Sequence, residues 1–191
     1  FHEGDEFSLS RETGRVENLA NALRGAGSDS SLGIAHTRWA THGSVTVSNT
    51  HPHQSQDGKF VLVHNGVIEN FSTLKRFLEG KGISFSSETD SEVLCNLIAY
   101  HYSELPEDED RFIDAVRLAL PKCRGAYGIA VLCLDSPGVM IGARRGSPLV
   151  VGLGDDANFI ASDASAFVGR AKEAVFLNDC ELAVLDQGGF R

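Results

Sequence analysis

The sequence predicts an α+β protein in which antiparallel sheets are covered by helices. Apolar residues at helical spacing dominate the first two thirds of the 191 residues, and short aliphatic or β-branched runs dominate the last third. The turns between those runs, such as residues 136–138 and 154–156, are too short for a parallel crossover, so neighbouring strands must be antiparallel. Residues 129–134 are apolar on both faces, which indicates a four-layer αββα sandwich with two facing sheets and helices outside.

Four sets of apolar residues predict helices before residue 125. Gly25 is placed to end the first helix, Asn70 and Gly80 flank the second, Asp90 can cap the third, and Pro121 closes the fourth. The apolar faces are Val16, Leu19, Ala20 and Leu23; Phe71, Leu74 and Leu78; Val93, Leu94, Leu97 and Ile98; and Phe112, Val116, Ala119 and Leu120.

Eight shorter runs predict strands, with one short helix near residues 164–168. The segment between residues 37 and 53 has no sustained apolar pattern, and a loop of that length in a compact domain is usually functional. The expected strands cover residues 32–39, 60–63, 83–85, 127–134, 139–143, 149–153, 158–161 and 181–185.

The composition is that of an ordinary globular domain, with 42% hydrophobic and 23% charged residues. The net charge of −9 disfavours binding to nucleic acid or to an anionic membrane. No apolar run approaches the roughly 18 residues of a membrane span, and the polar start does not resemble a signal peptide. The four cysteines lack CxxC spacing, which suits a reducing compartment, so we expect a cytoplasmic protein.

Arg38 and Trp39 form the first candidate site, at the end of an expected strand. The planar fork of an arginine suits a carboxylate or a phosphate, and the single Trp beside it could wall off an apolar slot. The alternative is an arginine that ends a strand next to a tryptophan of the core.

Asn65 and Gly66 form the second candidate site. An asparagine amide beside a glycine N–H is a common way to build an oxyanion hole, although a tight Asn-Gly turn is the simpler interpretation. Asp90 is the third candidate, either as a plain helix cap or as a partner for a ligand ammonium. Together with Arg38, these residues are what a free amino acid with a side-chain carbonyl would require.

Five histidines lie between residues 36 and 64, but their spacing is not that of a metal site, and we expect no metal. Residues 144–148 resemble a phosphate-binding nest only loosely, and a turn between strands is the favoured interpretation.

The strings that carry these candidates resemble the glutaminase domains of glucosamine-6-phosphate synthases, the glutamine–fructose-6-phosphate aminotransferases (isomerising). These are class II glutamine amidotransferases with the αββα fold of N-terminal-nucleophile hydrolases. The resemblance runs in order from about Arg15 to the C-terminus. The matching strings are IAHTRWATHG (34–43), NTHPH (49–53), HNGVIEN (64–70), SETD (87–90), RGAYG (124–128) and GSPL (146–149).

The resemblance implies a glutaminase domain over residues 1–191 that hydrolyses L-glutamine and passes ammonia to sugar-phosphate isomerase domains outside these residues, giving glucosamine 6-phosphate. It implies no cofactor, and a homodimer formed through the full-length protein. By matching position, Arg38 would bind the glutamine α-carboxylate, Asp90 the α-ammonium, and Asn65 with Gly66 the oxyanion. The pocket would also be lined by Trp39, Thr41 and His42.

The family nucleophile is an N-terminal Cys, whereas this sequence begins with Phe1. The family's first strand and first helix are also absent from these residues, so we expect the 191 residues alone to be inactive. None of the internal cysteines, at positions 95, 123, 133 and 180, can supply both the thiol and its own α-amino base. A glutamine-binding homologue without catalysis and an inert fragment are therefore the alternatives.

Overall fold

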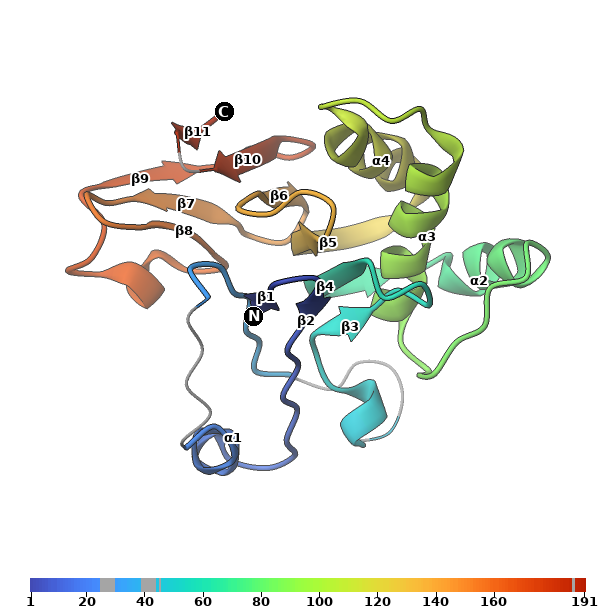
Figure 1. Ribbon diagram of the computed structural model, residues 1–191, viewed down its shortest axis with the longest axis horizontal. Helices are drawn as coiled ribbons and strands as arrows, with labels where there is room; N and C mark the ends of the chain where they lie inside the picture. The colour runs from blue at the N-terminus through green and yellow to red at the C-terminus, as the bar shows by residue number, and fades with distance from the viewer. Residues whose placement is uncertain (25–29, 39–43, 45, 187) are drawn as a thin grey trace.

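The computed structural model describes residues 1–24, 30–38, 44, 46–186 and 188–191 (Figure 1). The helices are α1 (Val16–Ala22), α2 (Phe71–Glu79), α3 (Asp90–Glu104) and α4 (Arg111–Ala119), with 3-10 helices η1 (Val47–Asn49), η2 (Leu120–Lys122) and η3 (Ala164–Phe167). The strands are β1 (His2–Glu3), β2 (Glu6–Phe7), β3 (His53–Gln54), β4 (Phe60–Ile68), β5 (Gly125–Cys133), β6 (Met140–Arg145), β7 (Val150–Leu153), β8 (Asn158–Ala161), β9 (Glu173–Phe176), β10 (Leu182–Asp186) and β11 (Gly189–Phe190).

The strands form antiparallel sheets, as the short connections predicted. The largest sheet has six strands in the order β11-β10-β6-β5-β4-β3, and a second sheet has the order β8-β7-β9. Helices α2, α3 and α4 lie together on one face of the six-stranded sheet (Figure 1). This arrangement confirms the predicted α+β class.

Residues 60–63 at the start of β4 are apolar at every position because successive side chains of the strand enter two different cores. Phe60 and Leu62 belong to the core beneath the helices, whereas Val61 and Val63 belong to a second core on the opposite face. Burial of each such side chain stabilises the fold by about 1.5–3 kcal/mol, so both faces favour this sheet strongly.

The second core lies between the two sheets. At Gly142 in β6, an added Cβ atom would stand 2.8 Å from Cδ1 of Ile160 in β8, so a glycine lets the sheets approach closely. At Gly152 in β7, the ring of Phe167 from η3 lies equally close, and η3 covers the three-stranded sheet at that point.

Strand β4 is longer than predicted. It was expected to end at residue 63, but its ladder with β5 continues from the pair Phe60–Cys133 to the pair Ile68–Gly125. Asn65 and Gly66 therefore lie within a paired strand, and the alternative of a tight Asn-Gly turn is wrong.

Two other expected strands, residues 32–39 and 83–85, are not strands in the described residues. In the first, Leu32 accepts one backbone hydrogen bond from His2, and Leu32 and Ile34 pack against the second core without joining a ladder. Ile83 and Phe85 pack against the helix-side core in the same way. In these segments the apolar residues indicated burial correctly, but no neighbouring strand is paired with them.

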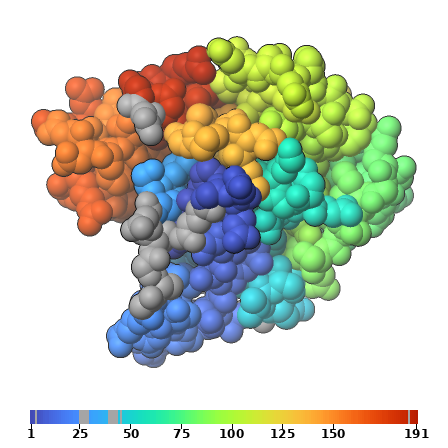
Figure 2. Space-filling view, in the orientation of Figure 1, coloured from blue at the N-terminus to red at the C-terminus, as the bar shows by residue number. Residues whose placement is uncertain are grey.

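Helix α1 forms as predicted, but it has no buried residue, and Val16 is 65% exposed. It lies at the lower edge of the face shown in Figure 2, in the blue N-terminal segment and far from helices α2–α4. The described part of the chain thus covers the apolar face of α1 only in part: Leu19 and Leu23 are half-buried, and Val16 and Ala20 are exposed.

The described helices include none that is both long enough and apolar enough to cross a membrane. The longest, α3, has 15 residues, most of them packed in the core.

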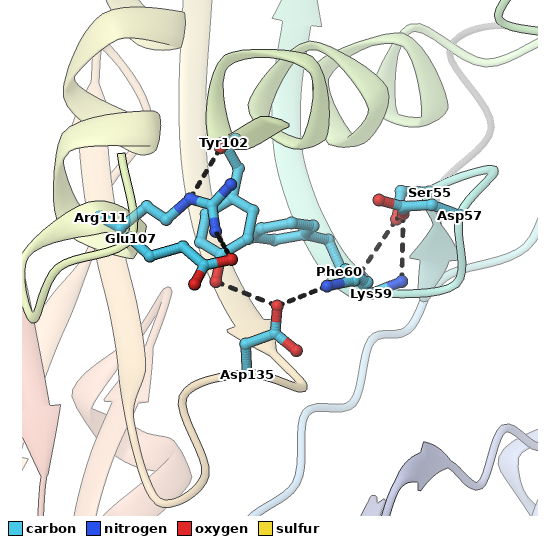
Figure 3. Close-up of polar contacts among 8 residues, drawn as sticks. All are labelled: Ser55, Asp57, Lys59, Phe60, Tyr102, Glu107, Arg111 and Asp135. Atoms are coloured by element: carbon cyan, nitrogen blue, oxygen red, sulfur yellow. Dashed lines mark hydrogen bonds and ion pairs between the residues drawn. The ribbon is translucent and has the colours of Figure 1, made fainter. Parts of the chain in front are cut away.

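A polar cluster connects α3 and α4 to the turn that follows the C-terminal end of β5 (Figure 3). The Tyr102 hydroxyl donates to Asp135 Oδ2 at 3.0 Å, and Lys59 Nζ lies 2.6 Å from the same oxygen. The Arg111 guanidinium lies 4.0 Å from the centroid of the Tyr102 ring, and its Nε donates to the Tyr102 carbonyl at 2.9 Å. Hydrogen bonds from Lys59 and Tyr102 lower the pKa of Asp135.

We expect Tyr102→Phe to lower the free energy of unfolding by about 1 kcal/mol, since one hydrogen bond is lost while the ring still packs. Lys59→Met, which removes an exposed ion pair, should cost less than about 1 kcal/mol. Because the folded pKa of Asp135 is lowered, both effects should be present at neutral pH and fade as the pH falls below about 4. Urea titrations at pH 7 and pH 3 measure this, and an undiminished difference at pH 3 would contradict it.

Gly66 is a second test of the fold. Its φ is +129°, and a Cβ atom would stand 2.2 Å from the Ala126 carbonyl oxygen. Gly66→Ala should therefore lower the free energy of unfolding by more than about 2 kcal/mol. Gly58→Ala is the control: its φ is +78°, and the nearest atom, in the flexible Gln54 side chain, is 3.7 Å away. That change should cost only about 1 kcal/mol, and equal losses in urea unfolding would refute the steric argument.

Candidate active site

A cavity of about 160 Å³ opens beside the middle of β4, where four separate segments meet. Arg38 comes from the segment of residues 30–38, Asn65 and Gly66 from β4, and Asp90 from the first turn of α3. The structure thus brings these four predicted residues to one cavity. Its full lining is His36, Thr37, Arg38, His51, His64, Asn65, Gly66, Thr89, Asp90 and Ser91.

The amide of Asn65 is held by a histidine. His36 Nε2 lies 2.7 Å from Asn65 Oδ1, so the imidazole N–H donates to the amide oxygen. This contact leaves the Asn65 amino group available to an acceptor in the cavity. The next residue, Gly66, has no room for a side chain, because the Ala126 carbonyl of β5 approaches its Cα so closely.

Asp90 is buried and lies at the start of α3. Its Oδ2 accepts a hydrogen bond from the Ile68 backbone N–H at 2.7 Å, and the first turn of the helix stabilises its charge. The prediction that Asp90 caps the helix is wrong, because the Thr89 hydroxyl accepts the capping hydrogen bond from Glu92 N. Asp90 is therefore available to the cavity that it lines.

Arg38 is connected to the α3 end of the cavity through Ser44. Its Nη1 donates to the Ser44 carbonyl at 3.3 Å. The buried amide of Asn49 donates to that carbonyl at 3.0 Å and to Glu88 Oε2 at 3.1 Å, and the Glu88 carboxylate also accepts from Ser44 N. These hydrogen bonds connect Arg38, through Ser44, to Glu88 in the segment that precedes Asp90.

The other predicted pocket residues, Trp39, Thr41 and His42, lie outside the described residues. A larger cavity of about 480 Å³ adjoins the site and shares its lining at His36, Thr37, Arg38 and His51.

Three of the clustered histidines have rings close together beside the cavity. The ring centroids of His36 and His51 are 4.1 Å apart, and those of His51 and His53 are 4.8 Å apart. Burial lowers the pKa of His36, lowers that of His51 to about 2, and lowers that of His53 to about 4. These rings are therefore neutral at pH 7, and the described residues contain no group of three or more side chains placed to hold a metal ion.

Sequence reasoning considered His36 only as a metal ligand and missed its contact with Asn65. No local signal reveals that contact, because the two residues are 29 positions apart. The cap was recognisable, since a threonine three residues before a glutamate is a capping signature, and Thr89 and Glu92 have that spacing.

None of the four cysteines lines the cavity. Cys95, Cys123 and Cys133 are buried, and burial raises the pKa of Cys95 well above its usual value, that of Cys123 to about 12 and that of Cys133 to about 11. These thiols are poor sources of a thiolate, which is the reactive form.

Comparison with known proteins identifies the family of the chain. Residues 5–108 match the glutamine amidotransferase domain family. A glutamine–fructose-6-phosphate aminotransferase (isomerising) of Neisseria meningitidis serogroup B is 44% identical over 181 residues, which cover 95% of this chain and 29% of the relative. The enzyme of the same name from Caldanaerobacter subterraneus is 40% identical and is covered to the same 29%. The chain thus spans less than a third of the length of these relatives.

The fold is also that of a solved amidotransferase. A glutamine phosphoribosylpyrophosphate amidotransferase from B. subtilis superposes with a TM-score of 0.65 at 28% identity, over 82% of this chain and 33% of the other. A family match over more than half of the residues, relatives of 40% and 44% identity and a shared fold lead to one conclusion: the chain belongs to the glutamine amidotransferase domain family.

Proposed function

We propose that this domain binds L-glutamine and is the glutaminase part of a glutamine–fructose-6-phosphate aminotransferase. The observation that carries the proposal is that a cation, a buried carboxylate and an amide donor line one small cavity, in Arg38, Asp90 and Asn65. The relatives named above support the choice of reaction.

In this proposal each end of glutamine has a partner. The Arg38 guanidinium binds the α-carboxylate, and the Asp90 carboxylate binds the α-ammonium. The side-chain amide of glutamine then reaches β4, where the Asn65 amino group and the Gly66 backbone N–H stabilise the oxyanion that forms on its carbonyl oxygen. By their matching positions in the family, Trp39, Thr41 and His42 would also contact glutamine.

The reaction consumes water and breaks the C–N bond of the glutamine side chain, giving glutamate and ammonia. The family nucleophile, an N-terminal Cys thiol, would form a γ-glutamyl thioester as ammonia leaves, and water would then release glutamate. The buried internal thiols and their raised pKa values argue against an internal nucleophile. Isomerase domains of the full-length protein would use the ammonia to make glucosamine 6-phosphate.

A glutamine-binding domain without catalysis is the competing function, because the same cavity would suffice for it. Ammonia and glutamate release by the purified full-length protein distinguishes the two. Equimolar production of both compounds supports the enzyme, whereas glutamine binding by calorimetry without turnover supports the binding domain.

Asn65→Ala should lower the kcat of glutamine hydrolysis by about 10²–10³, the usual effect of losing one oxyanion donor. The KM should change little, because the interaction develops mainly in the transition state. Asn158→Ala in β8, the same change far from the cavity, should leave both constants unaltered. A kcat within threefold of wild type would refute the oxyanion role.

Arg38→Lys should raise the KM for glutamine about tenfold or more while kcat changes less, since the charge remains but the fork that binds the carboxylate is lost. Arg117→Lys on the surface of α4 is the matched control and should match wild type. Equal KM values in the two variants would contradict a bidentate contact.

A further inference from the structure

We infer that His36 is a positioning residue for the oxyanion hole: its imidazole fixes the Asn65 side chain with the amide oxygen turned away and the amino group directed into the cavity. This inference rests on the proposed glutaminase function. It adds a residue that orients the amide of the oxyanion hole before the substrate reacts.

The two ends of an asparagine amide have almost the same shape but opposite polarity. If the amide rotated by half a turn, an oxygen lone pair would face the developing oxyanion and repel it. Asn65 is exposed, and its hydrogen bond to His36 is the only one that the described residues offer its side chain. That single contact, 2.7 Å long, thus decides which end faces the substrate.

The direction of the hydrogen bond also fixes the imidazole. Since Asn65 Oδ1 can only accept, His36 Nε2 must carry the hydrogen. Burial keeps the ring neutral by lowering its pKa, so the neutral form has its hydrogen on Nε2 and not on Nδ1. Because Nε2 is already donating, this nitrogen cannot take a proton from a nucleophile, and its role toward Asn65 is to orient the amide.

A column of rings holds His36 in place. The His51 ring packs against it, tilted by an interplanar angle of 36°, and His53 meets His51 edge-on at 76°. His53 Nε2 in turn lies 3.1 Å from the hydroxyl of Thr89, the residue that caps α3. The column therefore extends from the oxyanion side of the cavity to the helix that carries Asp90.

The test uses the full-length protein and two near-isosteric variants. Glutamine places its side-chain amino group close to the position of histidine Nε2, whereas asparagine is too short and matches Nδ1 only. We expect His36→Asn to lower the kcat of glutamine hydrolysis at least tenfold with KM within threefold of wild type. His36→Gln should restore kcat to within threefold of wild type. His101→Asn, the same exchange near the far end of α3, controls for the substitution itself, and thermal melting verifies folding.

The double variant decides whether His36 acts through Asn65. If it does, His36→Asn combined with Asn65→Ala should have the kcat of Asn65→Ala alone, within threefold. A further tenfold loss in the double variant would overturn the inference, as would a His36→Asn variant that raises KM at unchanged kcat. If Asn65→Ala itself keeps its kcat, the oxyanion role in the proposed function fails as well. If Asn65→Ala loses activity but His36→Asn does not, only the positioning role fails.

Discussion

The hydrogen bond from the Ile68 backbone N–H to the buried Asp90 carboxylate joins the two elements on which the site depends. It fastens the end of β4 to the first turn of α3, so the strand that carries Asn65 and the helix that carries Asp90 keep a fixed separation. Removing a charge-assisted bond of this kind from a buried setting leaves unsatisfied groups that cost several kcal/mol. The cavity between strand and helix therefore has a defined length, which a ligand must match.

The cavity is charged at one end and neutral at the other. Arg38 and Asp90 carry opposite charges at one end, whereas the histidines beside Asn65 are kept neutral by burial. Because the surroundings on the β4 side are neutral, the amide and backbone dipoles are the groups that would meet the negative charge developing in the proposed reaction. Preoriented dipoles in such a setting need little reorganisation during the reaction.

The sequence predicted most of this fold where local and tertiary preferences agree. Helix α3 combines a cap with a strong apolar pattern, and β8 was predicted with the bounds that it has. Prediction failed where a neighbouring strand determines whether a segment is a strand. Strand β4 continues through polar residues because β5 pairs with it. Residues 32–38 have a strand-like pattern but pair with no strand in the described residues. The candidate site was predictable as a set of residue types, but the His36 contact depends on the tertiary fold alone.

The long ladder between β4 and β5 has a consequence for selectivity. Asn65 and Gly66 lie within nine consecutive residue pairs, so local opening there would require breaking much of the central sheet. Arg38 stands instead on a segment that joins no ladder within the described range. The β4 side of the cavity therefore has support from the central sheet that the Arg38 segment lacks. A competitive analogue whose carbonyl is displaced by a single bond length should lose affinity, because the sheet cannot shift to follow it.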